Sequence, residues 1–246
     1  MHLTPDRKQA YLVSIPRDTY TEVAGHGMQK INAAFSLGGP SLAVQTVESF
    51  TGLRMDHTAI IDWNGFRDLS DALGGVRVYI SETTASQRGV GGEWVQGWTT
   101  LEGDRALRYV RTRYGLANGD YDRIQRQQNF LRAALDQTAS RGTLTDPLKF
   151  PALIKSFTNN VTLDTGLGNG ELTKLAFSVR GLRSPDITFV TAPKARFEDN
   201  RSGSVIIPDR ARTKELFADV EDNDLQAYLT KYGDRAGVLG PETGIR

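Results

Sequence analysis

Short apolar runs alternate with segments of helical periodicity near the start of the chain, and this alternation restricts the fold more than any other feature. Residues 9–15, 57–62 and 76–80 are apolar and rich in β-branched or aromatic side chains, as buried strands are. Between them, residues 40–50 and 64–73 carry apolar positions at helical spacing. This β–α–β–α–β order predicts an α/β domain, a three-layer α/β/α sandwich with a central mixed sheet.

The rest of the chain predicts further helices and strands. Thr99 and Glu102 fit a capping box for a helix that runs through Val110, and Asn64 fits the cap of the earlier helix. The other expected elements are helices at 122–138, 147–157, 171–182 and 209–220, and strands at 187–191 and 205–207. On the helix over 122–138, the side chains expected to face the core are Ile124, Leu131 and Leu135.

The length and composition are those of one large globular domain with a short tail. The chain has 246 residues and turns polar and glycine-rich after Glu221, which predicts a domain over 1–220 and a loose tail over 221–246. With 39% hydrophobic and 24% charged residues and no long apolar run, a disordered chain and a multi-span membrane protein are excluded. The absence of cysteine excludes disulfides, thiolate metal sites and a cysteine nucleophile.

The most unusual charge pattern is an arginine-rich segment between Arg105 and Arg132. It holds seven arginines, two aspartates and no lysine, a balance of +5 in 28 residues of a chain whose net charge is +1. Within it, Asp120, Arg123 and Gln127 are spaced to share one face of a helix. Guanidinium groups on adjacent elements suit phosphate oxygens, and their mutual repulsion favours a bound anion. The sequence therefore predicts an anion site.

Two other interpretations of the arginine-rich segment stay open. A solvated face with weak surface ion pairs explains the arginines without any ligand. Aromatic residues are interleaved with the arginines, an arrangement that also suits single-stranded nucleic acid, although the rest of the chain is close to neutral. These aromatic residues are Tyr109, Tyr114, Tyr121 and Phe130.

Several motifs resemble those of the LytR–CpsA–Psr family, and they follow one another in the family's order. They are SIPRD at 14–18, KINAAF at 30–35, GGP at 38–40, DALGGV at 71–76, LEG at 101–103, YVRTR at 109–113 and GDYDRIQRQQ at 119–128. The resemblance is dense over residues 3–137, and the pattern over 187–220 is similar to the closing strand and helix of the family.

This resemblance implies a phosphotransferase of the cell envelope. Such an enzyme moves a glycopolymer from a polyprenyl-pyrophosphate carrier to a sugar hydroxyl of peptidoglycan and leaves a phosphodiester link. The implied partners are the lipid-linked glycan, the peptidoglycan acceptor and, through the substrate tail, membrane lipid, with no specific nucleic acid. The implied cofactor is Mg²⁺ (or Mn²⁺). The full-length family protein is implied to work on the extracytoplasmic face of the cell membrane.

The resemblance also implies which residues form the site, and we expect them to converge on one pocket. Those implied in pyrophosphate binding are Arg17, Lys30, Arg111, Arg113, Arg123 and Gln127. Those implied in catalysis are Arg17, Arg111, Arg113, Asp120 and Arg123. The general base is left unassigned.

One departure from the family pattern concerns the start of the chain. In the family, the cation-binding aspartates, a further arginine and a membrane-anchoring helix precede the stretch that corresponds to LTPDR at 3–7. We therefore expect a domain that lacks its first strand and its metal ligands. Two alternatives follow: a truncated module that binds the lipid pyrophosphate without transferring it, and a nucleic-acid-binding transcriptional attenuator, a role once given to the family.

Overall fold

The structure is a computed structural model with two compact units, each of which is described by itself. It describes residues 1–81, 83, 94–112, 120–140, 142, 146 and 148–242. Unit 1 comprises Met1–Thr4, Ala10–Thr58 and Thr188–Val238, and unit 2 comprises Pro5–Gln9, Ala59–Ile187 and Leu239–Arg246. The prediction of one domain over 1–220 stays a prediction.

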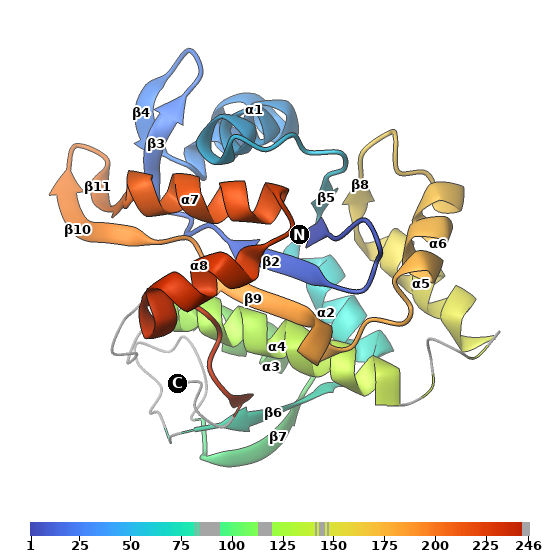
Figure 1. The fold of residues 1–246 in the computed structure, drawn as a ribbon. Coiled ribbons are helices and arrows are strands. Elements are labelled where there is room, and N and C mark those ends of the chain that lie inside the picture. The colour runs from blue at the N-terminus through green and yellow to red at the C-terminus, as the bar shows by residue number, and fades with distance from the viewer. Residues whose placement is uncertain are drawn as a thin grey trace. The chain divides into compact units, whose positions relative to one another are not determined.

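Unit 1 is built from a small sheet, two hairpins and helices that pack beside them. The sheet has the order β1 (His2–Leu3), β2 (Ala10–Ser14) and β9 (Ile187–Thr191). The antiparallel hairpins pair β3 (Tyr20–Val23) with β4 (Gly27–Lys30), and β10 (Lys194–Asn200) with β11 (Gly203–Pro208). The helices are α1 (Ala33–Thr51), α7 (Arg210–Glu221) and α8 (Leu225–Tyr232), followed by the short turn η2 (Gly233–Ala236). Figure 1 shows α7 lying alongside α1.

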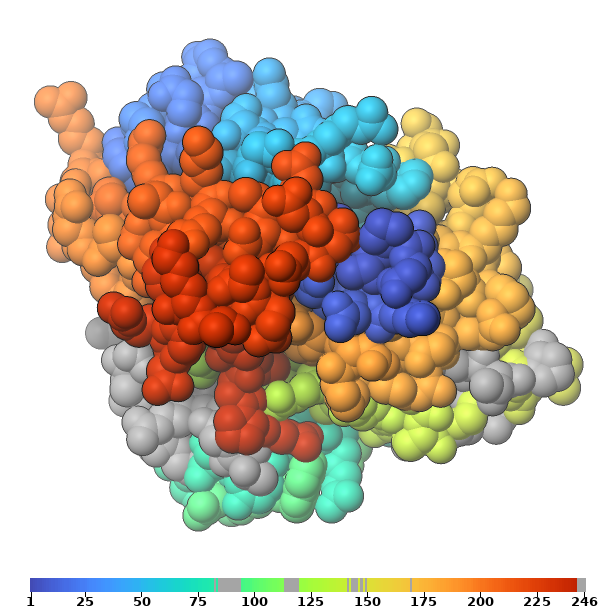
Figure 2. Space-filling model, in the orientation of Figure 1, coloured from blue at the N-terminus to red at the C-terminus, as the bar shows by residue number. Residues whose placement is uncertain are grey.

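The expectation of a loose tail after residue 221 is wrong for α8. Leu225 and Tyr228 are only 1% and 0% exposed, and they join a core with Tyr11 of β2 and Leu216 of α7. The polar composition of this stretch conceals apolar residues at helical spacing, which is enough to dock a short helix. Figure 2 shows α7 and α8 as one continuous surface.

Helix α1 is kinked where the GGP motif interrupts it. Gly38 (φ −145°, ψ 20°) and Gly39 (φ 66°, ψ −159°) leave the helical region, and Pro40 opens the next helical turn. The positive φ of Gly39 is a conformation that L side chains rarely adopt, so this position favours glycine. The helix then ends at Gly52, whose φ is 78° and whose N–H donates to the Glu48 carbonyl oxygen, as expected for a glycine cap.

Unit 2 places helices beside two short antiparallel sheets. The sheets pair β5 (Ala59–Ile60) with β8 (Thr162–Leu163), and β6 (Val76–Ile80) with β7 (Gly97–Leu101). The helices are α2 (Trp63–Ala72), α3 (Gly103–Arg111), α4 (Asp120–Ser140), α5 (Lys149–Asn160) and α6 (Asn169–Ser178), followed by the turn η1 (Ser184–Asp186). Figure 1 shows α4 lying beside the β6–β7 hairpin. Val78 of β6, Tyr109 of α3 and Phe130 of α4 contribute to one core cluster.

Two predicted helix caps of unit 2 are wrong. The carboxylate of Asp62 accepts from the N–H of Gly65 at 2.7 Å and caps α2, so Asn64 lies inside the helix. Thr99 belongs to β7, where it pairs with Val78, and Glu102 precedes α3 without a side-chain cap. Threonine is also enriched in strands. Here the pairing of Thr99 with Val78 across the hairpin outweighs the local capping signal.

The core face of α4 differs from the prediction at one position. Ile124 is buried as expected, but Leu131 is exposed, and Phe130 and Ala133 take the buried positions. The strands predicted at 9–15, 76–80 and 187–191 are confirmed, and so is the α/β class. Among the described residues, every helix is too short or too polar to cross a membrane.

Candidate anion-binding site

Arg17 and Lys30 gather around Asp18 in unit 1. The β3–β4 hairpin pairs Tyr20 with Lys30, and the N–H of Asn32 donates to the Arg17 carbonyl oxygen at 3.2 Å, so the two ends of the hairpin are held together. The Lys30 ammonium lies 3.3 Å from Asp18 Oδ1, and the Nε of Arg17 lies 3.7 Å from the same oxygen. The hairpin thus brings two of the predicted residues to one place.

Asp18 is a member of this group to which the sequence analysis gave no role. Its carbonyl oxygen accepts from the N–H of Ile206 on β11, which fixes the backbone, and its carboxylate lies between Arg17 and Lys30. One carboxylate balances one of the two positive charges, so the group keeps a net positive charge. The signal that identifies Asp18 is its place next to Arg17 in the SIPRD motif.

In unit 2, the end of α3 and the start of α4 carry the remaining described residues of the predicted site. A guanidinium nitrogen of Arg123 lies 2.5 Å from Asp120 Oδ1, and the two side chains are only 11% and 13% exposed. Gln127 donates from Nε2 to the carbonyl oxygen of Val110 at 3.1 Å, which joins α4 to the last turn of α3. The shared helix face predicted for Asp120 and Arg123 is confirmed by their contact.

Arg111 contacts an exposed tryptophan at the end of α3. Its guanidinium carbon lies 4.6 Å from the centre of the Trp63 ring, and Trp63 is 58% exposed. Among the described residues, no carboxylate forms an ion pair with Arg111, in contrast to Arg123. Trp63 was not predicted as a site residue, and its signal is a large aromatic residue at the first position of a helix that lies beside α3.

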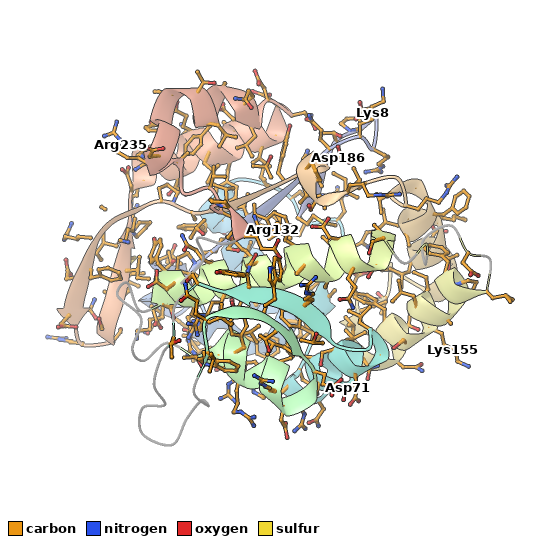
Figure 3. All side chains as sticks on the ribbon, turned by 90° about the horizontal axis from the view of Figure 1, so that it is seen from below. Lys8, Asp71, Arg132, Lys155, Asp186 and Arg235 are labelled. Carbon is orange, nitrogen blue, oxygen red and sulfur yellow. The ribbon has the colours of Figure 1, made fainter. Side chains whose placement is uncertain are left out.

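Two other arginines of the arginine-rich segment have structural partners. Arg126 is 1% exposed and lies 5.0 Å from the ring centre of Tyr109, a phenol whose pKa is raised mainly by burial. Arg132, labelled on α4 in Figure 3, donates to the carbonyl oxygen of Gly240 at 2.9 Å and to Asn129 Oδ1 at 2.6 Å. Burial lowers the pKa of Arg132. Both side chains therefore hold unit 2 together.

The structure brings the predicted residues together as two groups. Arg17 and Lys30 lie in unit 1, whereas Arg111, Asp120, Arg123 and Gln127 lie in unit 2. Because each unit is described by itself, convergence of both groups on one pocket stays a prediction. Arg113 lies outside the described residues.

The carboxylates of these groups do not fit a magnesium site on their own. No group of three or more His, Asp or Glu side chains suited to a metal occurs among the residues that the structure describes. Asp18 is engaged by Lys30 and Arg17, and Asp120 by Arg123. Magnesium prefers several free oxygen ligands in an octahedral arrangement, which two separately paired carboxylates do not provide.

A sequence model of the LytR_cpsA_psr family matches residues 1–221. The chain belongs to the LytR–CpsA–Psr family. The match ends where α7 ends, so α8 lies beyond it.

Two curated relatives from the LytR–CpsA–Psr family illustrate the similarity. The chain is 40% identical over 214 residues to the probable cell wall biosynthesis protein LcpB of Corynebacterium glutamicum. The matched region covers 87% of this chain and 50% of LcpB. It is 33% identical over 179 residues to the polyisoprenyl-teichoic acid–peptidoglycan teichoic acid transferase TagU of Enterococcus faecalis, covering 72% of this chain and 56% of TagU. The chain therefore spans about half the length of these relatives.

A crystal structure supports the same family fold. TagV of B. subtilis aligns with a TM-score of 0.76 and 26% identity, over 91% of this chain and 86% of TagV. The fold class predicted from the sequence is thereby confirmed.

Proposed function

We propose that the chain is the transferase part of an enzyme that moves a glycopolymer from a polyprenyl-pyrophosphate carrier to a sugar hydroxyl of peptidoglycan. The observation that carries this proposal is its 33% identity to TagU of Enterococcus faecalis, a protein named for teichoic acid transfer to peptidoglycan. The arrangement of the cationic side chains supports it, because both groups of predicted residues offer positive charge, Arg17 and Lys30 in unit 1 and Arg111 and Arg123 in unit 2.

In this proposal the side chains of the chain bind and orient the pyrophosphate. Arg123, held by Asp120, offers guanidinium N–H groups whose direction is set before the ligand arrives. Arg111 has no acidic partner among the described residues, so its full charge is available to a phosphate oxygen. Fixed donors of this kind stabilise the negative charge that grows on the leaving phosphate without reorganising during transfer.

The proposed transfer also involves a cation and a general base. We propose that Mg²⁺ assists the transfer, as the family resemblance implies, but the described carboxylates do not form its site. Asp18 and Asp120 both neutralise neighbouring cations. The general base therefore stays unassigned.

We propose that the partners are a lipid-linked glycan and peptidoglycan, which places the work at the extracytoplasmic face of the cell membrane. Membrane lipid would be met through the polyprenyl tail of the substrate. Several relatives carry the name regulatory protein MsrR, for example a Staphylococcus aureus protein 28% identical to this chain. The regulator alternative is therefore included among the outcomes of the test.

The test is a transfer assay with the chain of 246 residues. A glycan on polyprenyl pyrophosphate is incubated with a peptidoglycan fragment, with and without Mg²⁺, and the phosphodiester-linked product is measured by mass spectrometry. Arg123→Ala should abolish product, whereas Lys155→Ala on α5, labelled in Figure 3, removes an exposed charge outside the motifs and should leave product unchanged. Donor binding without transfer supports the binding-module alternative. Sequence-specific binding to a DNA duplex at physiological salt, with no donor binding, overturns the proposal.

A further inference from the structure

Trp63 is an exposed aromatic residue that core packing does not explain. It is the first residue of α2, and it lies 58% exposed to solvent although burial of its ring would be favourable. Its described partner is the guanidinium of Arg111, 4.6 Å from the ring centre. An exposed tryptophan beside a cation of the proposed pyrophosphate site calls for a functional explanation.

The position of Trp63 is fixed by three contacts along α2. Antiparallel packing puts the start of α2 beside the end of α3, since Arg67 bonds to Asp104 at 2.7 Å and Ser70 accepts from the N–H of Gly103 at 2.8 Å. The capping carboxylate of Asp62 holds the first turn of α2. The ring of Trp63 therefore lies beside Arg111 because the start of α2 and the end of α3 are held next to each other.

Contact with a ring leaves the binding edges of a guanidinium group free. A guanidinium that lies over an aromatic ring uses its π face, while its five N–H groups point outward in its own plane. Those in-plane groups are the ones that bind phosphate oxygens in pairs. An acidic partner would instead occupy them, as Asp120 does for Arg123. Trp63 can therefore hold Arg111 in place without competing with an anion.

We propose that Trp63 is a positioning residue that holds the Arg111 guanidinium ready for a pyrophosphate oxygen. This inference rests on the proposed function, because it assigns a task to a neighbour of the pyrophosphate site. Trp63 acts through Arg111 and does not touch the substrate. The chain thus orients one arginine with a carboxylate and another with an aromatic ring.

The test measures binding of geranyl pyrophosphate and of inorganic pyrophosphate to the full chain by calorimetry. Trp63→Ala should weaken binding about two- to fivefold, the range expected for an exposed cation–π contact, and Trp63→Phe should restore most of the affinity. Arg111→Ala should weaken binding about tenfold or more. In the double variant, the loss should equal that of Arg111→Ala alone, since Trp63 has nothing left to position.

A matched control comes from the β6–β7 hairpin of the same unit. Trp98 is 47% exposed, and the guanidinium of Arg77 lies 4.5 Å from its ring centre, outside the motifs that define the site. Trp98→Ala should leave pyrophosphate binding unchanged, and thermal unfolding of each variant reports whether the fold is intact.

The outcomes separate this inference from the proposed function. If the Arg111→Ala variant binds both ligands as tightly as the wild type, Arg111 does not bind pyrophosphate, and the proposed function is contradicted at this residue. If Arg111→Ala weakens binding and Trp63→Ala does not, only the positioning role is overturned. Additive losses in the double variant also overturn it, because they show that Trp63 contacts the ligand directly.

Discussion

Replacing Gly65 by alanine should destabilise unit 2 through a backbone collision. A Cβ at this position would lie 2.0 Å from the carbonyl oxygen of Asn160, the last residue of α5, and 3.0 Å from its carbon. Because Cβ contacts below 3.0 Å essentially do not occur, the two helix ends would have to separate by about 1 Å in a close-packed region. Overpacking of this kind costs about 1–3 kcal/mol. Partial loss of the Asp62 cap adds up to about 1 kcal/mol.

The gain in helix propensity offsets part of this cost. Alanine is favoured over glycine inside a helix by about 0.5–1 kcal/mol, so at the midpoints of these ranges the net loss in free energy of unfolding should be about 2 kcal/mol. Gly170 of α6 is the matched control, since a Cβ there meets no atom within 4 Å and Gly170→Ala should be neutral or stabilising. Urea unfolding followed by circular dichroism measures both variants. A Gly65→Ala loss below about 0.5 kcal/mol, the range of ordinary surface substitutions, would refute the argument.

Three further predictions concern binding and pH. Arg123→Ala should lower the affinity for geranyl pyrophosphate by about 1.5–3 kcal/mol in calorimetry, as expected when one charged partner of a phosphate is lost, and Lys155→Ala should not. Oligonucleotide binding, measured by fluorescence anisotropy, should be weaker than pyrophosphate binding and fall steeply with salt; tight, salt-resistant binding would contradict this. Hydrogen bonds from Lys231 and then Tyr232 hold the pKa of the Glu215 carboxyl below its ordinary value of 4.5. A carboxyl group whose pKa is lower in the folded than in the unfolded protein stabilises the fold at pH values above its unfolded-state pKa. This stability is lost as the pH falls through the folded-state pKa, so Glu215→Gln should flatten the loss of stability below about pH 4.5. Thermal melts from pH 3 to 7 check this, and identical acid profiles of the two proteins would contradict it.

Local sequence signals identify elements well where packing and propensity agree. The apolar run at 76–80 forms β6 as predicted, because alternate side chains of the strand are buried and its composition favours a strand. The stretch at 97–101 was misread, since Thr99 with Glu102 satisfies a helix-cap pattern while Trp98 and Thr99 pair with Tyr79 and Val78 across a hairpin. Pairing over such a distance along the chain leaves no local trace. The hairpin of β3 and β4, which brings Lys30 to Asp18, is local but was also missed, because its short strands YTEV and GMQK show little apolar character.

The arginine-rich segment shows most clearly what sequence reasoning leaves undetermined. The sequence presents its arginines as equivalent charges, yet the structure gives the described ones different environments. Arg126 is buried, and the half-buried Arg132 donates to the Gly240 carbonyl oxygen. Arg123 is paired with a carboxylate, Arg111 contacts an exposed ring, and Arg105 and Arg108 are exposed. Burial removes Arg126 from contact with a ligand, and existing partners limit Arg123 and Arg132, so the affinity for an anion depends on which guanidinium edges stay accessible. We therefore propose that an anion whose oxygens match the guanidinium edges of Arg111 and Arg123, such as a compact pyrophosphate, binds better than an extended polyanion.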